Sequence, residues 1–329
     1  MVHEDFGNVI TAMVTPFSED GKLDLDGAEL LANHLLKNGT DTLLLIGSTG
    51  EAAQLSPEEK ELIIKRVRDY TPKNTKIIVA ASDTNTMRAV AKAKRAVELG
   101  ANGILVAVPE YIKPPQESLR QHFSIIADAI SNTPMIIYNI PGRTGTEILP
   151  ETVAQIATEH PNVIGIKQSM GNMDKVSELK ALCPANFQIY SGDDSLTLPM
   201  LALGAKGVVS VASHLEGKLI QSMIRSFKNG QVEKAQELHH LLFPLYKALF
   251  MTTNPIPVKE ALYVHHMIDS PKLRTLGEMS TEGKTNLHQK LAQFEINKHN
   301  YLEKKKKNAE WIKQTFGPLD RGRKYIPTK

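Results

Sequence analysis

The sequence contains one cysteine, Cys183, among its 329 residues. A single thiol excludes an internal disulfide framework and any zinc site built from several cysteines. Hydrophobic residues make up 41% of the chain and charged residues 23%, a balance typical of a globular protein rather than a disordered or fibrous one. A chain of this length can therefore build a stable hydrophobic core without disulfide bonds.

Long hydrophobic runs are also missing. No apolar stretch approaches the roughly 18 residues that cross a membrane. The segment Met1 to Phe6 carries acidic residues where a signal peptide would carry basic ones. We therefore expect a cytoplasmic protein that has no membrane partner.

Several common ligand-binding motifs do not occur. The chain has no phosphate-binding P-loop, no G-x-G-x-x-G and no H-E-x-x-H, so binding of nucleotides or dinucleotides and zinc-protease chemistry lack support. The adjacent carboxylates Asp193 and Asp194 could bind a metal ion. Such a pair without partnering histidines more often caps the following helix, so we expect no metal site.

Short apolar segments recur along the first two thirds of the chain. They are rich in β-branched residues and bounded by Gly, Pro, Asn or Asp, which is typical of strands buried on both faces of a parallel sheet. The expected strands are Val9 to Val14, Thr42 to Ile46, Lys76 to Ala81, Gly103 to Val108, Pro134 to Tyr138, Val163 to Lys167, Phe187 to Ser191 and Gly207 to Val211.

Helical patterns separate these strands. Ser56-Pro57-Glu58-Glu59 starts one helix with a capping box, and Gly100 ends the next. Eight strands that alternate with helices predict an α/β fold, a closed (β/α)8 TIM barrel. The expected helices are a segment from Ser56, Asn85 to Leu99, Gln116 to Ile130, Pro150 to Thr158, Met173 to Leu182 and Leu196 to Leu203, followed by Val232 to Phe250, Val258 to His266 and Thr281 to Gln293.

The last three helical patterns have no strands between them. We therefore expect a barrel over residues 1–230, a helical C-terminal addition over 231–300 and a basic tail over 301–329. The tail holds nine basic residues against three acidic ones, a net charge of +6, whereas the whole chain carries +3.

Polar side chains follow three of the expected strands at their carboxyl ends, where barrel enzymes build their sites. Lys167 closes Val163-Ile164-Gly165-Ile166, Tyr138 closes Met135-Ile136-Ile137, and Ser48-Thr49 follow Leu43-Leu44-Leu45-Ile46. Burial disfavours a charged lysine, and the neutral amine is the form that attacks a ketone to make a Schiff base. A strand that simply ends in water at a snorkelling lysine is the alternative for Lys167.

A Schiff-base reaction also needs a proton shuttle and donors for a substrate carboxylate. Tyr138 could move protons, Ser48 and Thr49 could hold a small anion, and Arg143 could bind a second carboxylate through two hydrogen bonds. Each has a structural alternative: a helix cap for the hydroxyls, a core aromatic for Tyr138 and a surface ion pair for Arg143. Their arrangement on successive strand ends favours a site.

Three motifs occur in a known order: Gly47-Ser48-Thr49-Gly50-Glu51, Tyr138 to Gly145, and Gly165-Ile166-Lys167. From about Asn8 to His266 the chain resembles the dihydrodipicolinate synthase and N-acetylneuraminate lyase superfamily. Ser191-Gly192-Asp193-Asp194, Gly207 to Val211 and Asn254-Pro255-Ile256-Pro257-Val258-Lys259 extend the resemblance.

The resemblance implies a Schiff-base lyase or aldolase that holds pyruvate on Lys167, without another cofactor, usually in a homotetramer built from dimers. It implies a proton relay of Tyr138, Ser48 and Tyr111, with the last reaching across a dimer interface. Serine stands at position 48 where threonine is usual, and it keeps the hydroxyl but loses the methyl group that restricts its rotamer. Thr49, Arg143, Gly192 and Val209 are implied to bind substrate.

Two branches of the superfamily differ in the aldehyde that they use. Arg143 favours the synthase, which condenses pyruvate with L-aspartate 4-semialdehyde to 4-hydroxy-tetrahydrodipicolinate in lysine and diaminopimelate synthesis. Ser48 and Gln168 are common in the lyase branch, which cleaves N-acetylneuraminate or a 2-keto-3-deoxy sugar acid. We favour the synthase.

Feedback inhibition by lysine is not expected. The family's effector pocket uses a tyrosine where this chain has Glu110, and histidines where it has Pro57 and Lys60; Asn85 is the residue that matches. Millimolar lysine should leave turnover nearly unchanged, and a saturable inhibition curve would contradict this.

The alternative from a different class of function is a barrel whose basic tail binds nucleic acid or an acidic partner, with its chemistry secondary or lost. Lys304 to Lys307 lie beside Tyr301 and Trp311, a combination suited to nucleic-acid phosphates and bases. A charge run at a terminus is more often a solvated helix end. We therefore do not expect nucleic acid as a partner.

Overall fold

A closed barrel of parallel strands forms the centre of the molecule. The computed structural model describes residues 4–316, and of residues 308, 309 and 311–316 it describes the backbone alone. Each strand pairs with the next along the chain, and the last pairs with the first, so the sheet closes. The strands are β1 (Val9–Ala12), β2 (Thr42–Leu45), β3 (Lys76–Ala80), β4 (Gly103–Ala107), β5 (Met135–Asn139), β6 (Val163–Gln168), β7 (Gln188–Ser191) and β8 (Gly207–Ser210).

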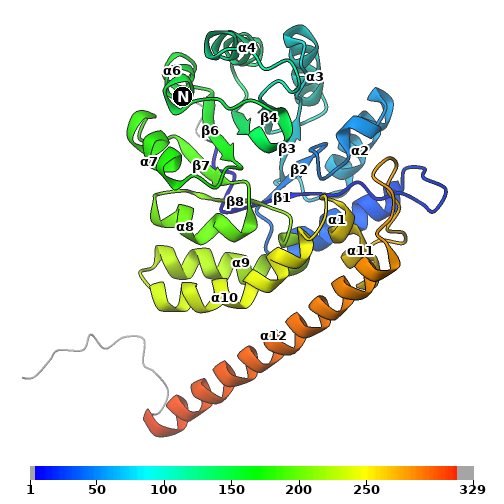
Figure 1. Ribbon diagram of the computed structural model, residues 1–329, viewed down its shortest axis with the longest axis vertical. Helices are drawn as coiled ribbons and strands as arrows, with labels where there is room; N and C mark the ends of the chain where they lie inside the picture. The colour runs from blue at the N-terminus through cyan, green and yellow to red at the C-terminus, as the bar shows by residue number, and fades with distance from the viewer. Residues whose placement is uncertain (1–3, 317–329) are drawn as a thin grey trace, which may run out of the picture.

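Helices surround this barrel (Figure 1). The predicted (β/α)8 barrel with added helices is therefore confirmed. The helices of the barrel are α1 (Leu25–Lys37), η1 (Ala52–Gln54), α2 (Pro57–Tyr70), α3 (Thr86–Glu98), α4 (Gln116–Ala129), α5 (Pro141–Thr144), α6 (Pro150–Glu159), α7 (Met173–Leu182), η2 (Asp194–Leu196), α8 (Thr197–Ala202) and α9 (Ser213–Lys228).

Two apolar clusters stabilise the barrel. The larger one lies between strands and helices, and the smaller one fills the barrel interior. Phe6 closes the interior at the amino ends of the strands, where a Cβ added at Gly103 would lie 2.5 Å from its ring. Tyr138 and Val209 belong to the same interior cluster. With one end closed, the opposite, carboxyl end is where a site can form.

The sequence patterns missed the short α5 and two longer barrel helices, α1 and α9. The side chain of Asp24 caps α1 by accepting a hydrogen bond from the Gly27 N–H, and Leu31 and Leu35 face the barrel. Helix α9 begins directly after β8 and contains a non-helical residue, Glu216, which breaks the regular apolar spacing. The capping box predicted at Ser56 and Glu59 is present at the start of α2.

Three further helices follow the barrel: α10 (Val232–Leu249), α11 (Ile256–Val264) and α12 (Thr281–Phe316). Figure 1 shows α12 running alongside α10 and then beyond it. Within residues 4–316 we find no helix with the length and apolarity that a bilayer crossing requires.

Helix α12 is longer than predicted. The pattern predicted an end at Gln293, but the helix continues to Phe316 through the basic run. Buried Phe294 and partly buried Tyr301 prolong its apolar stripe, and Lys298 pairs with Glu216 of α9 at 2.6 Å. Tertiary contacts with α9 and α10 thus override the polar sequence.

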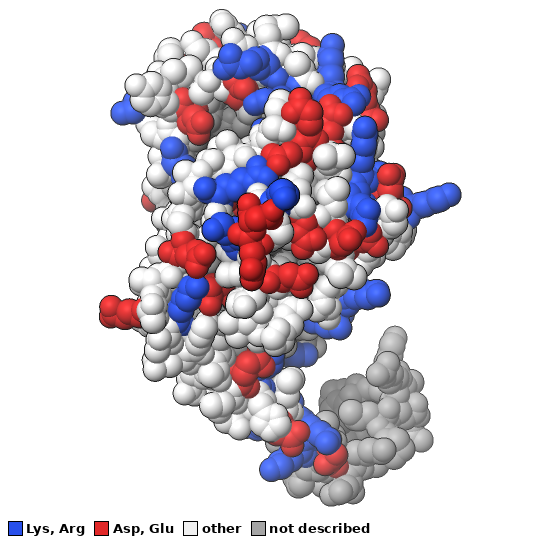
Figure 2. Space-filling view, turned by 90° about the vertical axis from the view of Figure 1, so that its right-hand side faces the viewer, with Lys and Arg blue, Asp and Glu red and all other residues white. Residues whose placement is uncertain are grey.

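Charges of both signs are mixed on the face of the molecule that Figure 2 shows, where basic and acidic side chains are interspersed. In the basic run, Lys305 pairs with Glu237 of α10, and its neighbours Lys304, Lys306 and Lys307 are exposed. Residues 317–329, which include Arg321, Arg323 and Lys324 of the predicted tail, lie outside the described residues.

Candidate active site

Lys167 and Tyr138 lie side by side at the carboxyl ends of β6 and β5. The two residues are partners in the strand register, and both side chains are buried, with 6% of Lys167 exposed. The Lys167 Nζ lies 4.0 Å from the centre of the Tyr138 ring, over its electron-rich face. The structure therefore does not support the alternative of a lysine that snorkels into water.

An amide pair fixes the same strand ends. The Asn139 Nδ2 donates to Gln168 Oε1 at 2.8 Å, and the Ser169 N–H donates to the Asn139 carbonyl oxygen. Asn139 and Gln168 each follow a predicted catalytic residue by one position. This hydrogen bond holds the two strand ends in register.

Gly192 brings the end of β7 against Lys167. A Cβ added at Gly192 would lie 3.1 Å from Lys167 Cε and 1.9 Å from Ser169 Oγ. Only a residue without a side chain allows this approach without movement of its neighbours. The resemblance implies that Gly192 binds substrate. Gly192 thus lies against Lys167, the residue that is implied to hold pyruvate.

Asp193 adds a carboxyl group next to Lys167. Burial raises the pKa of the Asp193 carboxyl, and the nearby Lys167 amine opposes that rise. The prediction of a metal ligand or a helix cap at Asp193 does not include this proximity to Lys167. Its position directly after a strand end was the available signal.

Asp194 does not cap the helix that follows it. Its buried carboxylate accepts hydrogen bonds from the Ser210 hydroxyl and from the N–H groups of Val211, at 3.0 Å, and Ala212, at 3.1 Å. Asp194 therefore stabilises the turn between β8 and α9. The prediction that this carboxylate caps the helix directly after it is wrong. Within the described residues no group of three or more His, Cys, Asp or Glu could hold a metal ion.

The glycine turn after β2 presents two hydroxyls. Ser48 is exposed and Thr49 is buried. The flanking residues Ile46 and Glu51 have φ values of +60° and +52°, a left-handed conformation that is rare for a branched residue such as isoleucine. The Thr15 hydroxyl donates to the Gly50 carbonyl oxygen at 2.7 Å. The turn is therefore held in a strained conformation by its surroundings.

A residue of the C-terminal helical region also contacts this turn. The Asn254 Nδ2 donates to Thr49 Oγ1 at 2.9 Å. The Asn254 carbonyl oxygen accepts a hydrogen bond from Arg143 Nη2 at 3.2 Å. The motif that begins at Asn254 is part of the resemblance, but no role is predicted from the sequence for Asn254 itself. Asn254 thus links Thr49 and Arg143, two residues that are expected to bind carboxylates.

A buried ion pair lies close to the same turn. The Lys259 Nζ lies 2.5 Å from Glu51 Oε1, and both side chains are almost fully buried. The amine also donates to the Lys272 carbonyl oxygen and lies over the Phe17 ring. Burial lowers the pKa of Lys259 to about 8, against the opposing effect of Glu51. Helix α11 is thus tied to the residue that ends the glycine turn.

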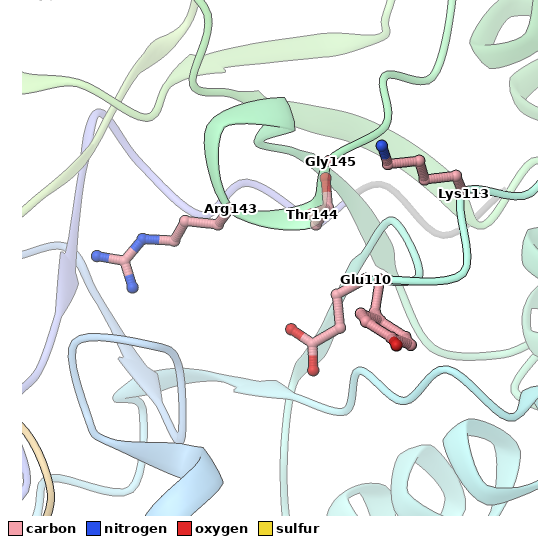
Figure 3. Close-up of a pocket in the computed structure, with 6 residues that line it drawn as sticks. Glu110, Lys113, Arg143, Thr144 and Gly145 are labelled. Carbon is pink, nitrogen blue, oxygen red and sulfur yellow. The ribbon is translucent and has the colours of Figure 1, made fainter.

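Arg143 and Tyr111 line an open pocket of about 730 Å³, together with Glu110, Lys113, Thr144 and Gly145. Figure 3 shows Arg143 projecting from α5 away from Lys113. The Tyr111 side chain is 89% exposed, and the φ of this residue is +71°. Among the described residues of this chain, no hydrogen bond joins Tyr111 to Tyr138 or Ser48.

The carboxyl end of the barrel thus brings together Lys167, Tyr138 and Gly192, with Thr49 and Arg143 linked through Asn254. Val209 lies in the barrel interior with Tyr138. Ser48 lies on the same turn as Thr49, and Tyr111 stands apart in the solvent-exposed loop after β4.

Known proteins share this architecture. Residues 5–294 match the model of the dihydrodipicolinate synthetase family. The 4-hydroxy-tetrahydrodipicolinate synthase of Cyanothece sp. is 51% identical over 258 residues, which are 78% of this chain and 87% of the relative.

Solved structures agree. The dihydrodipicolinate synthase of Cyanidioschyzon merolae, crystallised with lysine bound, has 39% identity and a TM-score of 0.86, and the match covers 88% of this chain and 99% of that one. The enzyme from Aquifex aeolicus has 40% identity, a TM-score of 0.85 and the same two coverages. Fold, strand-end residues and relatives agree, and this chain belongs to the dihydrodipicolinate synthetase family.

Proposed function

We propose that this chain is a lyase that condenses pyruvate with L-aspartate 4-semialdehyde to form 4-hydroxy-tetrahydrodipicolinate. The observation that carries the proposal is the buried Lys167 amine, which lies against Tyr138 at the open end of the barrel. The curated relatives with about half of their residues identical are named for this synthase activity. Their names favour the synthase over the lyase branch that Ser48 and Gln168 suggested.

Lys167 supplies the nucleophile. Its amine attacks the C2 ketone of pyruvate, and loss of water leaves an imine. Loss of a methyl proton then gives an enamine, whose carbon attacks the aldehyde of the second substrate. The amino group of that substrate displaces Lys167 from the imine carbon, which closes the ring and frees the enzyme. The imine itself is the electron sink, so this chemistry needs no metal ion or other cofactor.

Tyr138 and Ser48 are proposed to move the protons. Each step from carbinolamine to enamine needs a group that gives and takes a proton close to Lys167. Tyr138 is in contact with that lysine, and the exposed Ser48 hydroxyl can pass protons toward solvent. Tyr111 of a second copy completes the relay, since among the described residues no hydrogen bond joins Tyr111 to Tyr138 or Ser48 of the same copy.

Four residues are proposed to bind the substrates. Thr49 holds the pyruvate carboxylate with its hydroxyl and backbone N–H, and Gly192 and Val209 line the space around the imine. Arg143 binds the carboxylate of the semialdehyde, for which a planar guanidinium is well suited. One of its N–H groups is already held by Asn254, which leaves the others for substrate.

Borohydride trapping tests the chemistry. The protein is incubated with pyruvate, reduced, digested and weighed; the expected adduct lies on Lys167 and is absent from Lys167→Ala. A coupled assay then compares L-aspartate 4-semialdehyde with N-acetylmannosamine as the aldehyde. Turnover with the semialdehyde supports the synthase, and turnover with the sugar alone would assign the chain to the lyase reaction. No adduct in the wild-type chain would overturn the proposal.

The shared relay predicts how two inactive variants behave together. In a mixture of Lys167→Ala and Tyr111→Phe chains, a mixed dimer contains one site with both native groups. About a quarter of all sites should regain activity if chains exchange freely and the dimer is symmetric. Activity that stays at the level of the separate variants would exclude a contribution of Tyr111 across the interface. Sedimentation of the same samples measures whether dimers pair into the expected tetramer.

A further inference from the structure

Asn254 lies outside the barrel strands, yet its side chain points at the catalytic turn. It occupies the connection between α10 and α11, and only 6% of it is exposed. The contact with Thr49 Oγ1 joins residues 205 positions apart in the chain. Packing alone does not explain an amide here, because its Oδ1 is buried without a hydrogen-bond partner among the described residues. An aliphatic side chain would leave no such unpaired atom.

The direction of this hydrogen bond determines what the Thr49 hydroxyl can do. A hydroxyl has one proton to donate and two lone pairs that accept. The Asn254 N–H occupies one lone pair, so the Thr49 proton is not used in this contact. The proton is therefore available to an acceptor in the site. A carboxylate is an acceptor without a proton of its own and forms a strong hydrogen bond with such a donor.

The position of Asn254 is fixed from both sides. Its carbonyl oxygen accepts from Arg143, and five residues later Lys259 pairs with Glu51. Thr49 and Glu51 are two residues apart on the glycine turn, so the C-terminal region contacts this turn at both positions. These two contacts fix the backbone around Asn254 relative to the turn, and from that backbone the buried side chain reaches Thr49.

We propose that Asn254 is a positioning residue that orients the Thr49 hydroxyl toward the carboxylate of pyruvate. The inference rests on the proposed function, which places pyruvate on Lys167 above this turn. Asn254 acts through Thr49 and does not touch the reacting atoms. Its loss should therefore weaken the binding of pyruvate and leave the binding of the aldehyde unchanged.

A double-mutant cycle tests this role. Asn254→Ala keeps the backbone carbonyl that holds Arg143 and removes the amide donor alone. We expect the KM for pyruvate to rise about fivefold, the effect of one hydrogen bond, while kcat and the KM for the aldehyde change less than about twofold. In the Thr49→Val background, which lacks the hydroxyl, the same substitution should change nothing further. Additive effects in the two backgrounds would overturn the proposal, as would an unchanged KM for pyruvate.

Asn254→Asp provides a second arm with nearly the same side-chain volume. Its carboxylate would accept the Thr49 proton and place a negative charge near the pyruvate carboxylate, so the KM for pyruvate should rise further than in Asn254→Ala. A KM equal to that of the wild type would overturn the proposal, and this variant carries the test if Asn254→Ala does not fold. Trapping of pyruvate by the wild-type chain separates the two ideas: without an adduct the proposed function fails, and with an adduct and unaltered variants only the role of Asn254 fails.

Discussion

Gly192 has no side chain, which allows the end of β7 to approach Lys167 closely. We expect Gly192→Ala to displace Lys167 and Ser169, because the added Cβ would lie 3.1 Å from one and 1.9 Å from the other. A misplacement of about 1 Å in a reacting group can cost about 10²-fold in rate, so we expect kcat to fall by up to that factor. Steady-state kcat with both substrates measures the effect.

Gly171→Ala is the matched control, since an added Cβ there meets nothing within 4 Å. Its kcat should equal that of the wild type. Full activity in Gly192→Ala would show that the turn can move away without disturbing the lysine.

A buried histidine makes stability depend on pH. His214 accepts from the Val14 N–H and donates to the Val211 carbonyl oxygen, and burial lowers its pKa to about 4 from 6.5. Between these values the unfolded chain binds the proton and the folded chain does not. Stability therefore falls as the pH drops from 6.5 to 4, by up to roughly 3 kcal/mol for this group.

Urea unfolding at pH 7.5 and 4.5 measures this loss. His214→Gln, which keeps a donor and an acceptor, should lose less stability on acidification than the wild type. His240→Gln changes an exposed histidine and should behave like the wild type. An equal loss in all three proteins would assign the acid sensitivity to other groups.

The residues of the site differ in how far the sequence could predict them. Lys167, Tyr138 and Thr49 follow apolar strands, so position along a strand predicted that they share one end of the barrel. Asn254 was beyond that reasoning, because its partner is 205 residues away and nothing local marks a long-range hydrogen bond. Tyr111 was expected from resemblance, and its role still depends on a second copy.

At the scale of elements, the ion pair of Lys259 with Glu51 joins helix α11 to the glycine turn. Lys259→Met removes the partner of the buried Glu51 carboxylate. We expect the free energy of unfolding to fall by about 3–5 kcal/mol, because an unpaired buried charge remains. Denaturant unfolding checks the value, and kcat/KM should fall as well because Glu51 ends the catalytic turn.

Two variants control for this result. Lys94→Met removes an exposed lysine of α3 and should leave stability unchanged. Lys259→Met combined with Glu51→Gln removes both charges and should recover part of the loss. If Lys259→Met were as stable as the wild type, the ion pair would contribute little to the free energy of unfolding.

The local sequence pattern predicted the bounds of the strands well and the bounds of the helices less well. The strands are short apolar runs between turn residues, and that signal is local. The continuation of α12 past Gln293 depends instead on contacts with α9 and α10, among them Lys298 with Glu216 and Lys305 with Glu237. The pattern of polar residues after Gln293 could not reveal those contacts.

At the scale of the whole molecule, the last part of α12 lies outside the family-matched stretch, which ends at Phe294. We expect deletion of residues 301–329 to leave kcat and both KM values within about twofold. Among the side chains that the structure describes, the deletion removes the exposed ion pair of Lys305 with Glu237 and spares that of Lys298 with Glu216. Steady-state kinetics of the two chain lengths checks this.

The same deletion tests the nucleic-acid hypothesis. The full and shortened chains should elute from immobilised duplex DNA at the same salt concentration. Later elution of the full chain, with a strong dependence on salt, would show that the basic segment binds phosphates.

The closed amino end of the barrel has a consequence for the order of events. Phe6 blocks that end, so ketone, aldehyde, water and product all pass through a single opening. In the proposed reaction pyruvate has to reach Lys167 first, because an aldehyde seated above this lysine would block its way. The finished ring must leave before another pyruvate can enter. A barrel that is open at one end thus imposes ordered binding, in which the ketone always precedes the aldehyde.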